Sequence, residues 1–362
     1  MQEKVLVIGG ATLDVIIAYE DMETLIHQRK GFTQSYLLLE EGKKIEVVKQ
    51  QNASGGGATN AAVGFKRQDY AVTLFCKVGR DFAGEAVLKE LQGYGLNTES
   101  ILFDEDIGTA TSFVVPSLKG DRTVFAYRGA NAHLLGEDLP LAHMKDAAFV
   151  YITSLSKASA AHLPDLVKEA RKQNVKVAVN PGISQLKRGS AYLKDSLYGI
   201  DTLILNEEEA KTLMSSILHD EGVPAEREAS VALDKLSIKS GHFSDGYFNL
   251  REFFQRVLSL GPHIVVVTAG SEGVYVATEE HLYFHAAPKI KVVNTLGAGD
   301  AFGSGFTGMW YRTGDIEQAI RAGVANSASV ISYPDAKTGL LETEGLVSSS
   351  TVHLGDLTQM DW

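Results

Sequence analysis

The chain has little cysteine: Cys76 is the only one among 362 residues. A single cysteine can form neither an intrachain disulfide nor a cysteine zinc cluster. The sequence also shows no basic segment and small-residue cleavage site of a secretory signal, and no apolar run of about 18 residues that would span a membrane. We therefore expect no membrane partner and a reducing compartment, the cytoplasm.

Basic residues are in the minority. Lys and Arg number 34 against 45 Asp and Glu, which gives a net charge of -11. A nucleic-acid-binding surface needs a basic field, so the charge argues against a nucleic-acid partner. The sequence has no Gly-x-x-x-x-Gly-Lys-Ser/Thr motif, and the glycines after the first apolar run lack the Gly-x-Gly-x-x-Gly spacing. A P-loop enzyme and a dinucleotide-binding fold are disfavoured, and a small polar ligand is the expected partner.

Short apolar runs alternate with segments of helical spacing. The runs "KVLVIGG", "VTLFCKVG", "AFVYIT", "VKVAVNPG", "TLILN" and "HIVVVTAG" are typical of strands buried on both faces of a mostly parallel sheet. Between them, segments such as "HLPDLVKEARKQ" and "EEEAKTLMSSIL" predict amphipathic helices. The alternation predicts a three-layer α/β/α domain whose ligands bind at the carboxyl ends of the strands.

Two regions interrupt this alternation. Residues 35–50 are predicted to form two strands joined by a turn at Glu41 and Gly42, and residues 111–127 a second pair. Together they predict a small β-sheet lid that closes over a ligand or pairs with another subunit. The main α/β domain then comprises residues 1–34, 51–110 and 128–345, with a polar insertion at 217–246 and a C-terminal tail at 346–362.

The segment "NTLGAGDAFGSGF", residues 294–306, places a carboxylate at the start of a buried helix. Gly297, Ala298 and Gly299 make a tight turn whose N–H groups are unobstructed, and Asp300 follows at once. The amino end of a helix binds anions, so a phosphoryl group is the expected ligand and Asp300 the base that takes a proton from an attacking hydroxyl. Asp300 could equally be a cap that stabilises the first turn.

This segment resembles the C-terminal signature of the PfkB, or ribokinase-like, family of sugar and nucleoside kinases. "SGGGATNAAVGF" at residues 54–65, followed by "KVGRDFAG" at residues 77–84, is similar to the N-terminal signature, and the resemblance extends from about residue 4 to residue 335. It implies a ribokinase-like fold, ATP and Mg2+ as cofactors, Asp300 as general base, and the amides of Gly297, Ala298 and Gly299 as the anion hole.

The resemblance also assigns substrate and nucleotide contacts. Asp14, Gly55, Gly56 and Asn60 match the elements that hold substrate, and Arg128 and Asn131 lie where relatives approach it. Asn206 and Glu209 match an element that organises magnesium and phosphate, Glu209 through water; an acidic helix start capped by Asn206 is the alternative. Thr268, Gly270, Gly273 and Asn326 match the nucleotide site. Asn294 replaces an acid near a monovalent-cation site, which leaves potassium activation open.

These observations favour an ATP-dependent kinase that phosphorylates a hydroxyl of a sugar. A nucleoside kinase needs an apolar cradle for the base, which Phe113, Phe125 and Tyr127 could supply, although they suit the packing of a small sheet equally well. A non-catalytic sugar- or nucleotide-binding regulator of the same fold is the hypothesis from another class. The projecting lid predicts a homodimer formed through it.

Overall fold

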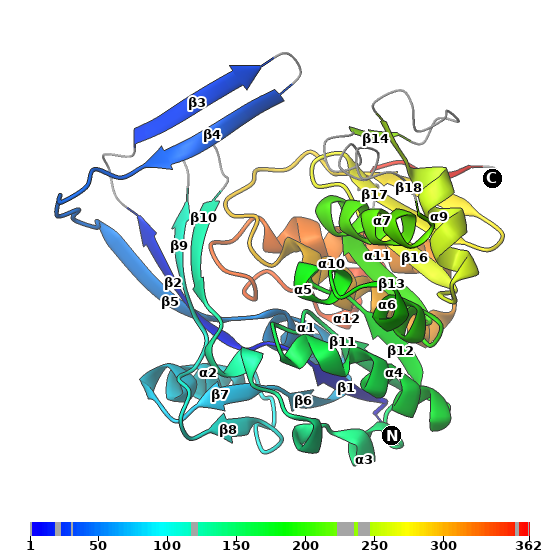
Figure 1. The fold of residues 1–362 in the computed structure, drawn as a ribbon, viewed down its shortest axis with the longest axis horizontal. Coiled ribbons are helices and arrows are strands. Elements are labelled where there is room, and N and C mark those ends of the chain that lie inside the picture. Colours follow the sequence, from blue (N-terminus) through cyan, green and yellow to red (C-terminus); the bar gives the residue numbers. More distant parts are fainter. Residues whose placement is uncertain are drawn as a thin grey trace.

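A nine-stranded sheet forms the centre of the computed structural model, which describes residues 2–18, 23–29, 32–116, 122–222, 235–237, 247–351, 355–360 and 362 (Figure 1). The order is β19-β18-β17-β16-β13-β12-β11-β1-β6. The six strands from β16 to β6 are parallel: β16 (Ile264–Thr268), β13 (Thr202–Asn206), β12 (Lys176–Val179), β11 (Phe149–Ile152), β1 (Lys4–Ile8) and β6 (Ala71–Phe75). The antiparallel edge is β17 (Gly273–Thr278), β18 (Leu282–Ala286) and β19 (Leu357–Met360). The mostly parallel sheet expected from the apolar runs is confirmed.

Helices cover both faces of this sheet and enclose two cores. Side chains along β1 point alternately to the two faces of the sheet. Val5 and Val7 pack in one core, and Leu6 and Ile8 pack in the other. The first core is closed by α1 (Gly57–Arg67), α2 (Phe82–Gly93), α10 (Ala298–Thr313), α11 (Ile316–Val330) and α12 (Thr343–Thr351). The second is closed by α3 (Leu141–Met144), α4 (Leu163–Lys172), α5 (Ile183–Leu186), α6 (Ser190–Leu197), α7 (Glu207–Asp220) and α9 (Leu250–Ser259). The three-layer α/β/α prediction is confirmed.

The lid is a separate four-stranded sheet of order β10-β9-β2-β5 (Figure 1). Its strands β9 (Thr111–Pro116) and β10 (Arg122–Tyr127) lie where the second strand pair was expected. Its other strands, β2 (Thr12–Ala18) and β5 (Lys49–Gly55), pair antiparallel with each other, and β2 also pairs parallel with β9. The lid therefore includes a strand from the first 34 residues.

Residues 35–50 differ from the expectation of two strands around a turn. The structure has a hairpin of β3 (Glu23–Arg29) and β4 (Phe32–Leu38), a turn at Glu41 and Gly42, and no strand at residues 39–48. Val47 and Val48 are apolar but exposed, whereas the polar segment that follows them pairs along β2. Here the residues that form a strand are those that lie beside β2, and not the most apolar ones, because β propensity depends on tertiary context.

The remaining segments are small. Strands β7 (Lys77–Gly79) and β8 (Leu102–Asp104) pair in parallel, as do β14 (Lys235–Ser237) and β15 (Tyr247–Asn249). Much of the expected insertion, residues 223–234 and 238–246, lies outside the described residues, and its first part is the end of α7. The expected tail contains the end of α12 and β19, which pairs with β18. Within the described part of the chain, no helix is both long and apolar enough to cross a membrane.

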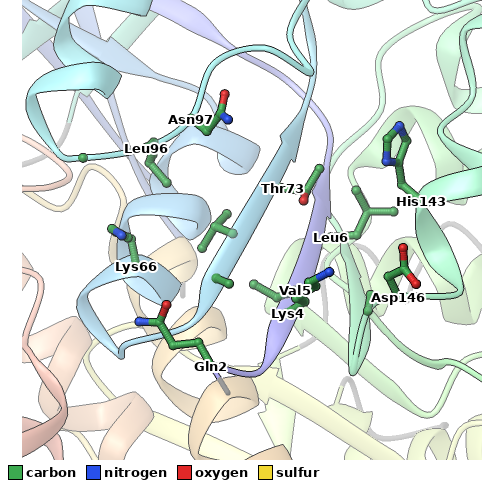
Figure 2. Close-up of a pocket in the computed structure, with 14 residues that line it drawn as sticks. Gln2, Lys4, Val5, Leu6, Lys66, Thr73, Leu96, Asn97, His143 and Asp146 are labelled. Atoms are coloured by element: carbon green, nitrogen blue, oxygen red, sulfur yellow. The ribbon is translucent and has the colours of Figure 1, made fainter.

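A cavity of about 300 Å³ lies at the amino ends of β1 and β6 (Figure 2). Lys4 and Leu6 of β1, Thr73 of β6, Lys66 of α1 and His143 of α3 border it. Ligands of open α/β sheets bind at the opposite edge, beyond the carboxyl ends of the parallel strands. We therefore place the candidate site at that other edge.

Candidate active site

Helix α10 begins at a glycine turn. Gly297 precedes its first residue with φ +76°, in the left-handed region, and a Cβ added there would lie 2.4 Å from the Cβ of Ala336. Only glycine fits this position without strain. Beyond the first turn, Phe302 and Phe306 are buried in the core, which fixes the helix axis. The first N–H groups of the helix have no partner within it, and that of Ala298 makes only a long bond to the carbonyl of Thr295 (3.4 Å), so an anion can bind there.

A cavity of about 750 Å³ opens beside this helix end. It brings together most of the residues expected at the anion hole and the nucleotide: its lining includes Thr268, Gly270, Gly273, Ala298 and Gly299. Gly299 is exposed to the cavity, with no heavy atom within 4 Å of the place where a Cβ would stand.

Asn326 lies elsewhere. Its side chain is fully buried, donates a hydrogen bond to the carbonyl of Ala301 (2.8 Å) and accepts one from the N–H of Leu341 (2.8 Å). The side chain therefore ties α11 to α10 and to the following loop. Its neighbours Ser327 and Ala328 border the cavity instead.

Asp300 lies between the amino ends of two helices. It occupies the first turn of α10, and a Cβ on Gly57, the first residue of α1, would stand 3.2 Å from its Oδ1. The amide nitrogen of Asn60 donates to Asp300 Oδ2 at 2.7 Å. Burial raises the pKa of the Asp300 carboxyl, while the bond from Asn60 and the charge of Lys337 act in the opposite direction. Such a carboxylate suits a base near neutral pH.

Asp14 projects from the lid strand β2 into the same region. It is 7% exposed, and the hydroxyl of Ser112 donates to its Oδ1 at 2.5 Å. A Cβ on Gly55 would lie 1.9 Å from Asp14 Oδ2, so this glycine makes room for the carboxylate. Burial raises the pKa of Asp14, and the negative charge of Asp300 acts in the same direction. The two carboxylates are therefore close enough to interact.

Gly56 completes the glycine pair. It has φ +95°, and a Cβ there would stand 2.4 Å from the carbonyl oxygen of Gly10. The close approach lets α1 start directly beneath the end of β1, where the N–H of Ala58 donates to the Gly10 carbonyl (3.2 Å). Asn60 then points toward Asp300 from the first turn of α1.

Lys337 is a site residue that we did not expect from the sequence. It is 1% exposed, and its ammonium donates to Asn60 Oδ1 at 2.6 Å and to the carbonyl oxygen of Ser54. Burial lowers the pKa of Lys337 to about 8, against the opposing effect of Glu90, Asp14, Asp300 and Asp335. The sequence indicates this residue only indirectly. Several carboxylates expected in a buried site require a cation nearby, but the sequence does not say which lysine or arginine supplies it.

Asn206 and Glu209 form a capping box at the start of α7. Asn206 Oδ1 accepts from the N–H of Glu209 (2.9 Å), and Glu209 Oε2 accepts from the N–H of Asn206 (2.8 Å). The cap that we considered as the alternative is therefore present. Burial raises the pKa of Glu209 to about 7, and the charges of Asp300 and Glu208 add to this. A buried carboxyl with a raised pKa near a second acid would be stabilised by a cation.

These residues fit a hydrated magnesium ion better than a directly ligated one. Among the residues that the structure describes, no group of three His, Cys, Asp or Glu side chains could hold a metal. Mg2+ keeps several waters and is often bound by phosphates and one or two carboxylates. Glu209 uses Oε2 for the cap and can contact such a water with its other oxygen.

The two expected substrate contacts after the lid differ in their surroundings. Asn131 accepts a hydrogen bond from the N–H of Ala11 (2.9 Å) and donates to its carbonyl (2.9 Å), so its side chain holds the loop before β2. Arg128 is exposed. A lid residue that sequence reasoning missed, Arg122, donates to the hydroxyl of Thr295 beside the anion-hole turn.

Asn294, at the start of the C-terminal signature, links two loops. Its amide donates to the carbonyl of Pro334 (2.8 Å) and accepts from the N–H of Leu296 (3.0 Å). The turn before α10 is thereby held against the loop that carries Lys337.

Two relatives and one solved structure are similar to this chain. An ATP-dependent ribose-1-phosphate kinase of Halopiger xanaduensis is 26% identical over 75% of this chain and 78% of its own length. A nucleoside kinase of Methanothermobacter thermautotrophicus is 23% identical over 85% of this chain and 88% of its own. The structure of Arabidopsis thaliana ribokinase complexed with ribose and ATP has the same fold, with a TM-score of 0.72, 19% identity, and coverage of 97% and 100%.

The family model described as pfkB family carbohydrate kinase matches residues 2–344, almost the whole chain. The expected resemblance and the expected phosphotransferase class, with an alcohol group as acceptor, are confirmed. The chain therefore belongs to the pfkB family of carbohydrate kinases.

Proposed function

We propose that this protein transfers the γ-phosphoryl group of ATP to a hydroxyl of a sugar. One observation carries the proposal: the free amino end of α10, the carboxylate of Asp300 and the carboxylate of Asp14 face one region at the carboxyl edge of the sheet. An anion site, a base and a group that binds hydroxyls are the three parts that phosphoryl transfer to an alcohol requires.

Each part has a role that follows from its chemistry. Asp14 accepts hydrogen bonds from sugar hydroxyls. A charged carboxylate forms stronger hydrogen bonds in this role than a neutral acceptor does. Asp300 takes the proton of the attacking hydroxyl. The amides of Gly297, Ala298 and Gly299 stabilise the charge that develops on the transferred phosphoryl group. ATP occupies the cavity bordered by Thr268, Gly270 and Gly273.

The bound Mg2+ supplies charge neutralisation on the phosphates. Glu209 would hold it through water, and Asn206 would hold Glu209 in place through the capping box. Asn294 is neutral, so it cannot attract a monovalent cation as an acid would. Activation by potassium stays an open prediction.

The faces of the lid favour a sugar over a nucleoside. Strand register puts Ser112 and Ala126 on the face of Asp14, and puts Phe113 and Phe125 on the opposite face with Val15. Tyr127 shares this second face, because side chains alternate along β10. The three aromatic rings therefore point away from the substrate side, where a base would need them.

The same register supports a homodimer through the lid. Phe113, Phe125 and Tyr127 are 49%, 53% and 57% exposed, an apolar patch on the outer face of the sheet. A second copy of the chain that covers this patch would bury it on both sides of a two-fold interface. We further propose a cytoplasmic location, where the buried thiol of Cys76 stays reduced.

The test begins with an ADP-release screen that offers ribose, fructose, a phosphorylated hexose, 2-keto-3-deoxygluconate, adenosine and cytidine. We expect one of the sugars to be the best acceptor. With that acceptor, Asp300→Asn should lower kcat by about 10²- to 10⁴-fold, the usual contribution of general base catalysis. The amide keeps the shape of the side chain and an oxygen that accepts from Asn60, so substrate binding and folding should persist.

Three outcomes separate the hypotheses. Unchanged turnover in Asp300→Asn would remove Asp300 as the base. Preference for adenosine or cytidine would establish the nucleoside kinase instead. Binding of sugar and ATP by calorimetry, with no ADP release from any acceptor, would favour the non-catalytic regulator.

A further inference from the structure

Lys337 is a buried cation at the centre of the site. It follows α11 in a loop held by Asp335, whose carboxylate accepts from the N–H groups of Lys337 (2.9 Å) and Thr338 (2.8 Å). This turn sends the Lys337 side chain inward, where it is 1% exposed. Burying an ammonium group costs free energy unless it is paired, so its partners are informative.

Those partners decide the orientation of Asn60. An ammonium group has three donors and no acceptor, so only the amide oxygen of Asn60 can face it. That contact is 2.6 Å long. The amide nitrogen of Asn60 is thereby turned the other way, and it donates to Asp300 Oδ2 at 2.7 Å. Without a donor at the Lys337 position, the amide could flip and present its oxygen to the carboxylate.

Lys337 also joins the main domain to the lid. Its ammonium donates to the carbonyl oxygen of Ser54 in β5, the strand paired with β2. The N–H of Ser54 in turn donates to Glu90 of α2 at 2.6 Å. The position of the strand beside Asp14 and the position of the base are therefore set by one side chain.

The charged groups that act on Lys337 are all acidic. Asp14 of β2, Glu90 of α2, Asp300 of α10 and Asp335 of the same loop all act on Lys337. In return, the positive charge of Lys337 lowers the pKa values of both Asp14 and Asp300 against the effect of burial. The charges that act on Lys337 thus come from three elements besides its own loop, so the cation affects more than the loop alone.

We propose that Lys337 is a positioning residue for the reaction: it holds the Asn60 amide, and through it the Asp300 carboxylate, in the orientation that faces the acceptor hydroxyl. The inference rests on the proposed function, because it assigns a support to the proposed base. Lys337 does not touch the reacting atoms in this role.

The test compares Lys337→Met with Lys337→Gln and with a matched control. Lys77 is also a buried lysine, 9% exposed and paired with Asp138 at 3.0 Å, but it lies in β7 and faces neither carboxylate of the site. We expect Lys337→Met to lower kcat roughly 10²-fold, the scale set by small misplacements of catalytic groups. The KM for ATP should change less than about threefold. Lys77→Met should lower stability without this loss of kcat in the folded fraction.

The pH profile supplies a readout that a purely structural lysine would not move. Asp300 is faced by Asn60 and Lys337, with Glu209 and Asp14 as further charges nearby. Loss of the cation should raise the pKa of the base, so the acid limb of kcat/KM should shift upward by about one pH unit in Lys337→Met. Lys337→Gln keeps a donor for Asn60 but not the charge. It should show the same shift of the limb with a smaller loss of kcat.

A double-mutant cycle tests whether the effect passes through Asn60. The losses in Asn60→Ala and Lys337→Met should be clearly less than additive in the double variant. Additive losses, or a Lys337→Met enzyme with wild-type kcat and pH profile, would overturn the proposal. Should the Met variant fail to fold, the Gln variant decides by the same two criteria. An inactive Asp300→Asn beside a fully active Lys337→Met would reject the positioning role alone, whereas an active Asp300→Asn would reject the base itself.

Discussion

Two glycines of the same turn should respond in opposite ways to one added methyl group. Gly299 lies in the first turn of α10, and its missing Cβ would meet no heavy atom within 4 Å. Alanine is favoured over glycine in helices by about 0.5–1 kcal/mol. Gly299→Ala should therefore raise the free energy of unfolding by a similar amount or less, since the position lies at the helix start.

The same methyl group should damage catalysis. Cβ atoms tilt toward the amino end of a helix, and Gly299 borders the cavity there. The methyl group would stand where the phosphoryl oxygens must approach the amides. Loss of one such donor typically costs about 10²- to 10³-fold in kcat, or about 2.7–4 kcal/mol. We expect a more stable protein with at least a hundredfold lower kcat.

Gly297→Ala gives the contrast. Its left-handed φ of +76° disfavours alanine, and the new Cβ would stand 2.4 Å from that of Ala336. Strain and overlap should together lower the free energy of unfolding by roughly 1–3 kcal/mol. Gly93→Ala, at the exposed end of α2 with nothing within 4 Å, controls for helix propensity alone and should leave kcat unchanged.

The measurements are urea unfolding and coupled ADP release with the acceptor found in the screen. Wild-type kcat and wild-type KM for ATP in Gly299→Ala would show that no phosphoryl oxygen approaches these amides. The anion-hole assignment would then fail, even if Asp300 proved essential.

Two further predictions concern the buried acid and the lid. The Glu209 carboxyl has a pKa of about 7 in the folded chain against an ordinary value of 4.5, so the folded state binds more protons between these values and loses stability as pH rises through that window. In urea titrations Glu209→Gln, which keeps an acceptor for the Asn206 N–H, should gain stability relative to wild type from about pH 4.5 to 7. A difference that stays constant with pH would contradict the raised pKa of Glu209. Phe125→Ser should shift a lid dimer toward monomer in sedimentation at micromolar concentration, and a wild-type monomer under the same conditions would exclude that dimer.

Local sequence patterns were sufficient to predict the backbone where a strand or helix is buried on both sides. The apolar run ending in Val267 and the glycine turn before Asp300 each specify one kind of backbone, so the sheet and the start of α10 could be predicted from the sequence. The lid was harder because its strands β5 and β10 are largely exposed, and β5 lacks a continuous apolar run. Val47 and Val48 have high β propensity but remain outside any strand, since β2 is already paired with β5 and β9.

Sequence alone also could not show which polar side chains turn inward. Asn326 matches a nucleotide contact by position, yet its amide is satisfied by the backbone of Ala301 and Leu341. The helical spacing that places Asn326 on α11 leaves its rotation toward α10 or toward the cavity undecided, and packing of the two helices decides it.

Lys337 illustrates a different limit. Its local sequence, "PDAKTG", is that of an exposed turn, and lysine is rarely buried. What draws it inward is the sum of charges contributed by β2, α2 and α10, elements far apart in the chain: Asp14, Glu90 and Asp300 would otherwise share a poorly hydrated region. Like charges brought together raise one another's pKa, and a neutral Asp300 could accept no proton. If Asp300 acts as the base, as we propose, it needs a cation beside it to stay charged, and the loop after α11 supplies one through Lys337.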